Sequence, residues 1–208
     1  MKDADTPPDD GQSRCNWACG TSVKRAYRDY HDGEWGVPVH DDNRLFEFIV
    51  LEGAQAGLSW RTVLDKRDNY RKAFHQFKIA RVAAMKDREL ERLLTDPGLI
   101  RNRLKIFSAR NNALHALELI AEHGSLDAWL WDFVDGKPIV NQWKSQGEVP
   151  ATTAISDQMS KTLHKRGFRF IGSTICYAFM QATGMVNDHL VDCFRHPRNA
   201  AGSGKARA

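Results

Sequence analysis

The most informative stretch of the chain is Lys165-Arg-Gly-Phe-Arg-Phe-Ile-Gly-Ser-Thr174, a short hairpin with a glycine at each end between two predicted helices. Glycine lets the backbone come close to another molecule, and the first turn of the following helix presents N–H groups without partners inside the helix. Phosphate binds well to such a helix start, especially with lysine and arginine beside it. This stretch therefore predicts binding of the DNA phosphate backbone by Lys165, Arg166, Gly167, Gly172 and Ser173. The alternative is an ordinary helix end followed by a turn.

Helical periodicity extends in both directions from this hairpin. Apolar spacing predicts helices over residues 45–51, 60–74, 87–94, 103–122, 126–134, 156–166 and 174–183. Ser125 and Ser156 are placed to cap two of these helices, and Gly124 and Gly167 to end two. Strand-like alternation is scarce, and no period of 20–50 residues repeats. The sequence therefore predicts an all-α fold.

Length and composition are those of an ordinary globular protein. The chain has 208 residues, of which 42% are hydrophobic and 27% charged, and these values exclude a disordered chain, a collagen or a coiled-coil rod. We expect one globular domain with two helical lobes over residues 14–196, between a disordered tail at 1–13 and a basic flexible tail at 197–208. Residues 170–187 are uncharged but contain several polar side chains, which indicates a buried helix rather than a membrane span. The N-terminus lacks the pattern of a signal peptide, so we expect a cytoplasmic monomer without a membrane partner.

The formal net charge is +4, and its distribution is more informative than its size. Basic residues concentrate in the segments 101–105 and 161–169. Such patches on a mildly basic chain suit a face that binds a polyanion. The alternative is the solvated surface of ordinary helices.

Two cysteines and two histidines near the chain ends are candidates for a metal site. His189 and Cys193 stand four residues apart, a helical spacing that places two ligands on one face, and Cys15 and His31 lie near the other end. Two thiols and two imidazoles form a closed tetrahedral zinc set, the structural kind without an open catalytic position. Such a site would join the N-terminal segment to the C-terminal one. The alternative is a set of stray cysteines and surface histidines.

Glu52 is the most unusual acid in the sequence. It lies in an otherwise uncharged run from residue 48 to 60, where a carboxylate must be paired or face a cavity. Aromatic residues gather in the preceding part of the chain, and a lone carboxylate among aromatic rings is a good receptor for a flat cationic or amide-bearing ligand. The alternative is that Glu52 merely reaches solvent from the edge of a helix.

Taken together, these segments resemble the bacterial DNA-3-methyladenine glycosylase I family. The matching segments are Arg14-Cys-x-Trp17, Tyr30-His-Asp-x-Glu-Trp-Gly-Val-Pro38, Leu45-Phe-Glu47, Leu51-Glu-Gly-x-Gln-Ala-Gly-Leu-Ser-Trp60, Ile100-Arg-Asn-Arg-Leu-Lys-Ile106, Lys165-Arg-Gly-Phe-x-Phe-x-Gly172, Cys176-Tyr-x-Phe-Met-Gln181 and Val186-Asn-Asp-His189. One stretch departs from the family pattern. Between Cys15 and His31 the family has a shorter segment with Asp-Pro-x-Tyr, whereas this chain is longer there and offers Cys19 as a rival metal ligand.

The resemblance implies a helix-hairpin-helix DNA glycosylase fold. It implies a repair enzyme that flips 3-methyladenine out of alkylated double-stranded DNA and hydrolyses its N-glycosidic bond. It implies one structural zinc ion per chain, held by Cys15, His31, His189 and Cys193. It implies Glu52 as the catalytic residue and a base pocket formed by Trp17, Tyr27, Tyr30, Trp35 and Trp60. Leu58 would either wedge into the gap left by the flipped base or be a core leucine.

The chemistry of the implied substrate explains why this family does without the catalytic aspartate that many relatives carry after the hairpin. Methylation at N3 makes the adenine cationic, so the base leaves as a neutral molecule and the bond is already weak. In this chain no acid follows Gly172 before Asp188.

Two other functions remain open, a helix-hairpin-helix protein that binds DNA without catalysis and a zinc-containing protein that binds a small cation.

Overall fold

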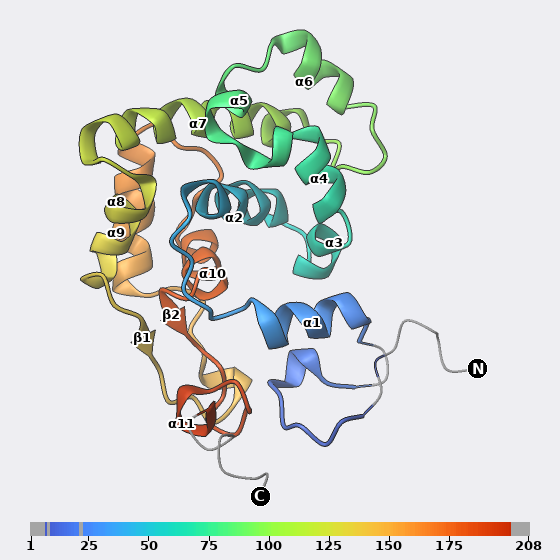
Figure 1. Cartoon of the computed structure of the whole chain (residues 1–208), viewed down its shortest axis with the longest axis vertical. Coiled ribbons are helices and arrows are strands. Elements are labelled where there is room, and N and C mark those ends of the chain that lie inside the picture. The colour runs from blue at the N-terminus through green and yellow to red at the C-terminus, as the bar shows by residue number, and fades with distance from the viewer. Residues whose placement is uncertain (1–6, 8, 21–22, 201–208) are drawn as a thin grey trace, which may run out of the picture. The chain divides into compact units, whose positions relative to one another are not determined.

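The structure is a computed structural model that describes residues 7, 9–20 and 23–200, and these form two compact units. Unit 1 comprises Met1–Pro38, Pro138–Ala151 and Gln181–Ala208, and unit 2 comprises Val39–Lys137 and Thr152–Met180. Figure 1 labels the elements of both units, each of which is described by itself. Most of the two expected tails lies outside the described residues. The C-terminal tail begins with one helical turn, α11 (Pro197–Ala200).

The expected all-α architecture is confirmed. Unit 2 contains α2 (Asp42–Gln55), α3 (Trp60–Leu64), α4 (Arg67–Ala73), α5 (Ile79–Ala83), α6 (Asp87–Leu93), α7 (Arg103–His123), α8 (Leu126–Trp131), α9 (Ala154–Lys165) and most of α10 (Ser173–Ala182). Unit 1 contains α1 (Arg25–Gly33), α11 and two short parallel strands, β1 (Ile139–Val140) and β2 (Val186–Asn187). Within the described residues, no helix combines the length and apolar character needed to cross a membrane.

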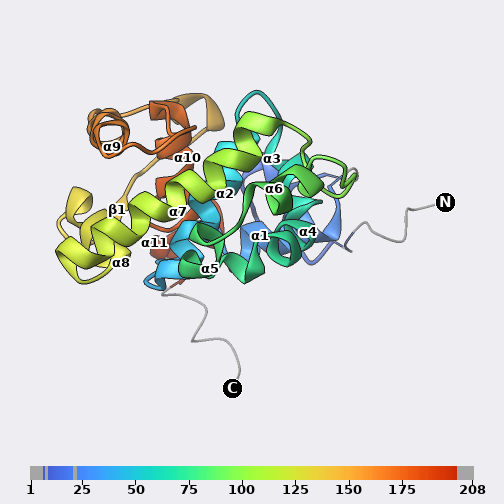
Figure 2. The ribbon, with the colours of Figure 1, turned by 90° about the horizontal axis from the view of Figure 1, so that it is seen from above.

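The core of unit 2 is built around α7, which contacts α2, α5 and α8 (Figures 1 and 2). Ala109, Ala113 and Ala116 are almost completely buried along one side of α7, and such small side chains let neighbouring helices approach closely. The helix begins at Asn102, whose side chain accepts a hydrogen bond from the Lys105 N–H, and it ends at Gly124 with φ of 87°. This long helix supports the segments on either side of it.

The structure corrects several of the predicted helices and adds α1 and α5, which the sequence did not predict. The helix expected over 60–74 is divided into α3 and α4 by a turn at residues 65–66. The helix expected from Ser156 begins earlier, because Thr153 is its N-cap and Ser156 closes a reciprocal capping box from the third position. The nine-residue helix α1 was not expected, because its segment mixes aromatic and polar side chains with glycine. Ser125 caps α8 as expected, accepting a hydrogen bond from Ala128 N–H at 2.9 Å.

Candidate functional site

Unit 1 brings together the four residues expected to bind a metal. Cys15, His31, His189 and Cys193 are all at most 1% exposed, and their ligand atoms lie within 4.8 Å of one another. His31 lies in the last turn of α1, and Cys15 directly precedes a short 3-10 helix (Asn16–Ala18). His189 and Cys193 lie in the turns that follow β2 rather than on a helix, so the helical explanation of their spacing is wrong. A turn closed by the Cys193 N–H and the Leu190 carbonyl brings them together instead.

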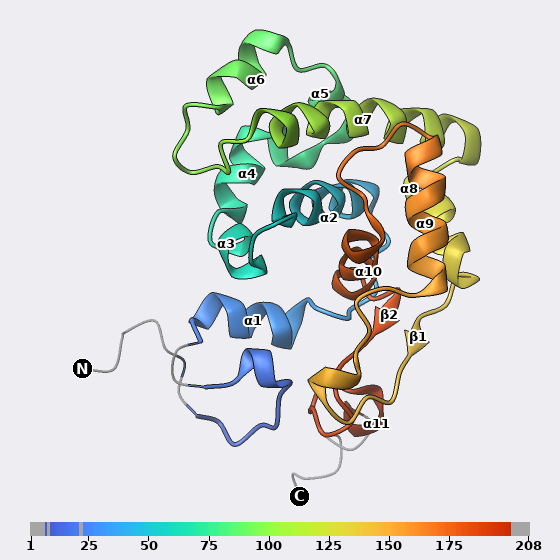
Figure 3. The same cartoon turned by 180° about the vertical axis from the view of Figure 1, so that it is seen from behind.

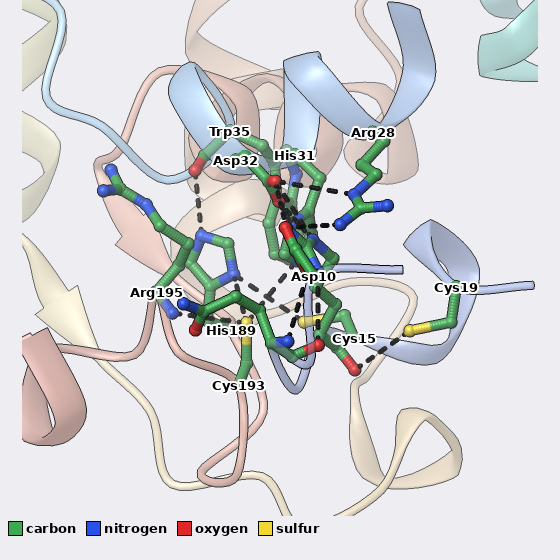
Figure 4. Close-up of polar contacts among 12 residues, drawn as sticks. Asp10, Cys15, Cys19, Arg28, His31, Asp32, Trp35, His189, Cys193 and Arg195 are labelled. Atoms are coloured by element: carbon green, nitrogen blue, oxygen red, sulfur yellow. Dashed lines mark hydrogen bonds and ion pairs between the residues drawn. The ribbon is translucent and has the colours of Figure 1, made fainter. Parts of the chain in front are cut away.

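The spacing of these atoms suits a tetrahedral ion. Cys193 Sγ lies 3.5 Å from His31 Nε2 and 3.4 Å from His189 Nδ1, and Cys15 Sγ lies 3.7 Å from His189 Nδ1 (Figure 4). Zinc bonds of about 2.3 Å to sulfur and about 2.0–2.1 Å to nitrogen, at tetrahedral angles, separate sulfur from nitrogen by about 3.6 Å. All four donors are used, so the arrangement fits a closed structural site rather than a catalytic one.

Neighbouring groups determine which nitrogen of each imidazole faces the cluster. His31 Nδ1 lies 2.7 Å from Asp32 Oδ1, so its Nε2 is left for the metal. His189 Nε2 lies 3.0 Å from the carbonyl oxygen of Trp35, so its Nδ1 is left for the metal. The Arg14 guanidinium holds Asp32 by hydrogen bonds of 2.7–3.0 Å. Such second partners orient metal-binding imidazoles and raise their basicity.

The two thiols have opposite proton affinities. Hydrogen bonds from Cys15, His189 and His31 hold the pKa of Cys193 far below its ordinary value, although burial opposes this. The same hydrogen bond to Cys193, together with burial, raises the pKa of Cys15. Cys193 is therefore the thiol that forms a thiolate more readily. A bound dication would remove the proton from Cys15 as well, because thiolates are the metal-binding form.

The structure separates Cys15 from its rival Cys19. Cys19 is exposed, and its Sγ lies 3.5 Å from the Arg14 carbonyl oxygen, away from the other ligands (Figure 4). Cys15 is the N-terminal cysteine whose sulfur faces the histidines. Its sulfur also accepts a hydrogen bond from the Leu190 N–H at 3.4 Å.

Four of the aromatic residues expected in the base pocket gather in unit 1. The Trp17 ring lies with its centroid 5.2 Å from Tyr27, 6.5 Å from Tyr30 and 5.1 Å from Trp35. Trp17 also lies edge-on to the His31 ring, and Trp35 edge-on to the His189 ring. The two tryptophans thus flank the four candidate metal ligands. A role in base binding stays a prediction for all four residues.

Glu52 lies in unit 2, on the last turns of α2, and is 2% exposed. Burial raises the pKa of Glu52 to about 8, and the charge of Arg67 offsets this only in part. Its Oε2 has no hydrogen-bond partner within the described part of the chain. That is costly for a buried carboxyl group. The interpretation that Glu52 reaches solvent from a helix edge is therefore wrong.

The surroundings of Glu52 are apolar. A cavity of about 10 Å³, lined by Glu52, Cys176 and apolar side chains of α2, α9, α10 and the hairpin, has room for about one water molecule. A purine does not fit there, so the expected base pocket is not this cavity.

The neighbouring acid Glu47 is, unlike Glu52, fully paired, since Arg67 and Arg71 bond to its Oε1 at 2.7 and 2.9 Å. These arginines keep the pKa of Glu47 low against desolvation.

Two further residues follow Glu52 in unit 2. Leu58 is 43% exposed, so the core interpretation is wrong and the side chain is accessible to a partner. Trp60 begins α3, whose N-cap is Ser59.

Lys105, which the sequence placed only in a basic patch, bonds through Nζ to the carbonyl oxygens of Ala54 and Ala56 at 2.9 and 2.6 Å. It therefore caps the end of α2, where its charge complements the helix dipole.

A short hairpin joins α9 to α10, as Figure 3 shows from behind. Gly167 adopts φ of 85°, and the exposed Gly172 has no atom within 4 Å of the position that a Cβ would occupy. Lys165 is exposed. Arg166 is paired with Glu122, which lowers the charge it can offer a phosphate. Ser173 donates to Asp157, so its hydroxyl is already engaged.

The acid that follows the hairpin is structural. Asp188, 2% exposed, accepts hydrogen bonds of 2.7–2.8 Å from Asn141, Trp143 and Gln181. These bonds position the segment that carries His189 within unit 1. Asp188 belongs to the family-like segment Val186-Asn-Asp-His189, but no sequence pattern predicted its structural role, because its partners lie up to 47 residues away.

Comparison with known proteins agrees with these features. The model of the methyladenine glycosylase family matches residues 17–196. The chain belongs to the methyladenine glycosylase family. It is 50% identical over 186 residues to DNA-3-methyladenine glycosylase 1 of Escherichia coli, which covers 89% of this chain and 98% of that protein. A relative named DNA-3-methyladenine glycosylase, from Haemophilus influenzae, is 48% identical over 87% of this chain and 96% of its own length.

A solved structure agrees with the family assignment. A single-site variant of 3-methyladenine DNA glycosylase I, in complex with 3-methyladenine, matches with a TM-score of 0.84 and 33% identity over 88% of this chain and 97% of that one. In the chain described here, Glu52 and Trp60 belong to unit 2, whereas Trp17, Tyr27, Tyr30 and Trp35 belong to unit 1. A pocket assembled from both sets stays a prediction.

Proposed function

We propose that this protein is a DNA repair glycosylase that excises 3-methyladenine from alkylated double-stranded DNA, acting as a monomer on cytoplasmic DNA. The observation that carries the proposal is Glu52, a buried carboxyl group with an oxygen that lacks a partner, in a member of the methyladenine glycosylase family. A buried acid without a partner destabilises the fold, and acids with a strongly raised pKa occur mainly at functional sites. We therefore assign Glu52 to ligand binding rather than to stabilisation of the fold.

Glu52 acts mainly in recognition of the damaged base. Burial alone keeps Glu52 largely protonated at neutral pH, and the positive charge of the bound base lowers its pKa so that the proton leaves to solvent. The resulting carboxylate accepts hydrogen bonds from the exocyclic amine edge, and its negative charge favours the cationic ring over unmodified adenine. Trp17, Tyr27, Tyr30, Trp35 and Trp60 supply aromatic faces, each of which attracts the cation by about 0.5–2 kcal/mol. A flipped neutral base gains neither advantage, so discrimination follows from charge.

The reaction needs little acid or base help. The bond between the sugar C1′ and the base nitrogen breaks, and its electron pair neutralises the positive ring, so that neutral 3-methyladenine leaves. Water adds to the sugar carbon and loses a proton to solvent. The enzyme has to extrude the nucleotide, at a cost of a few kcal/mol, and hold it while water attacks.

The hairpin and Leu58 engage the DNA. Backbone amides at the start of α10, beside Gly172 and Lys165, bind phosphates without reading sequence. The exposed Leu58 fills the gap that the flipped base leaves in the stack. Ser173 and Arg166 contribute only if they exchange their present partners, Asp157 and Glu122, for phosphate.

The metal held by Cys15, His31, His189 and Cys193 is one structural zinc ion per chain. When bound it supplies folding energy by joining residues 15 and 193, and it takes no part in the bond cleavage. The closed donor set and the flanking tryptophan rings support this role, because they leave no open coordination position.

The deciding experiment is release of free base from methylated DNA, resolved by base identity. We expect release of 3-methyladenine, and slower release by Glu52→Gln, by one to three orders of magnitude, comparable to one charge-assisted contact or one proton-transfer group. Binding of DNA without base release by the wild type would favour the alternative, a non-catalytic helix-hairpin-helix protein. Normal binding of free 3-methyladenine by a Glu52→Gln variant that cannot cleave would make Glu52 a catalytic base.

A further inference from the structure

Asn112 makes a reciprocal contact with the hairpin. It lies on α7 and is 2% exposed. Its Nδ2 donates to the carbonyl oxygen of Arg169 at 3.0 Å, and the Arg169 N–H donates to its Oδ1 at 2.8 Å. The neighbouring Asn111 donates to the Gly167 carbonyl oxygen at 2.8 Å. Both ends of one buried amide are therefore used on the backbone of a single hairpin residue.

The hairpin residue next to this contact is strained. Phe170 adopts φ of 57°, in the left-handed region that bulky residues rarely occupy. Such a conformation persists only where the surroundings over-determine it. On the α2 side of the hairpin, a Cβ added at Gly53 would lie 3.2 Å from the Phe170 Cβ and 3.3 Å from its carbonyl oxygen. The hairpin is thus bonded on the α7 side and closely packed on the α2 side.

We propose that Asn112 is a positioning residue that holds the hairpin in its phosphate-binding conformation, with Gly53 as the opposing support. This rests on the proposed contact between the hairpin and DNA. A buried amide costs desolvation energy unless it is bonded, so an apolar side chain would serve better if packing alone were needed. The amide specifies one loop conformation, and this prearranges the amides of residues 173–175 before DNA arrives.

The test compares Asn112→Ala with Ser108→Ala in the full-length, zinc-containing protein. Ser108 is a matched control, because it is buried on the same helix but bonds to the Lys105 carbonyl of α7 itself. Affinity for a duplex containing a stable abasic-site analogue is measured over a range of salt concentrations, and binding of free 3-methyladenine is measured separately. Asn112→Leu, which fills a similar volume without adding a charge and bonds to neither Arg169 group, serves as the second variant if Asn112→Ala does not fold.

We expect Asn112→Ala to weaken duplex binding about tenfold, the effect of one or two neutral hydrogen bonds. The slope of log affinity against log salt should fall by about 0.9 for each phosphate that the variant no longer neutralises. Free-base binding and the behaviour of Ser108→Ala should match the wild type. A purely structural role would lower the active fraction without changing the salt slope.

Gly172→Asp separates failure of this proposal from failure of the DNA-binding role itself. If Gly172→Asp weakens duplex binding and Asn112→Ala (or Asn112→Leu) leaves affinity and salt slope unchanged, Asn112 does not position the hairpin. If neither substitution changes duplex binding, the hairpin does not contact DNA, and both proposals are wrong.

Discussion

Replacing Glu52 with glutamine should stabilise the protein increasingly as the pH rises. Burial raises the pKa of Glu52 from 4.5 to about 8, so between these values the native state holds a proton that the unfolded chain has lost. A raised acid pKa contributes stability at low pH that is lost as the pH rises towards the folded value, at about 1.4 kcal/mol per pH unit. The wild type should therefore lose about 3 kcal/mol relative to Glu52→Gln between pH 5 and pH 8.

The measurements are urea denaturation and thermal melting of both proteins at pH 5, 6, 7 and 8, each followed by tryptophan fluorescence with zinc present. Groups that titrate in both proteins cancel in the difference, so the divergence reports Glu52 alone. At pH 8 the melting temperature of Glu52→Gln should exceed that of the wild type by about 10 °C, from about 2–4 °C per kcal/mol for a chain of this length. Asp68→Asn, at an exposed carboxylate of α4 whose ion-pair partner is Arg71 rather than a histidine, is the charge-matched control and should show no divergence. Parallel profiles of unfolding free energy against pH for Glu52→Gln and wild type would refute the idea that burial raises the pKa of Glu52.

Three further predictions concern the metal and the hairpin. Cys193→Ala should lose about one zinc per chain and become less stable, whereas Cys19→Ala should keep its zinc. Metal analysis and thermal melts of both variants check this. Loss of zinc in Cys19→Ala would assign the N-terminal ligand to Cys19 instead of Cys15. Asp32→Asn should weaken zinc affinity about 10–100-fold, because Asp32 orients His31; competition with a chelating dye measures this, and unchanged affinity would deny Asp32 that role. Gly172→Asp should weaken DNA binding alike for all sequences and flatten its salt dependence; a loss confined to particular sequences in binding assays would indicate base readout instead.

Several features followed from the sequence alone because they depend on local spacing. Gly124 and Ser125 were predicted to end α7 and cap α8, and the structure confirms both. The glycine-bounded hairpin at 165–174 was predicted from turn and helix signals within ten residues. The four candidate metal ligands were named from a helical spacing that the structure does not show and from the family resemblance, because donor chemistry alone does not choose among four cysteines and eight histidines.

Other features required the tertiary structure. The choice of Cys15 over Cys19 depends on which sulfur faces His189, 174 residues away, and Asp188 is structural only because donors distant in the sequence converge on it. The sequence showed that Glu52 was isolated in its run but not that its Oε2 lacks a partner. Asn112 is an unremarkable polar residue of a helix until its bonds to Arg169 are seen. Sequence patterns record covalent neighbours, whereas burial and hydrogen-bond satisfaction depend on which distant segments the fold brings into contact.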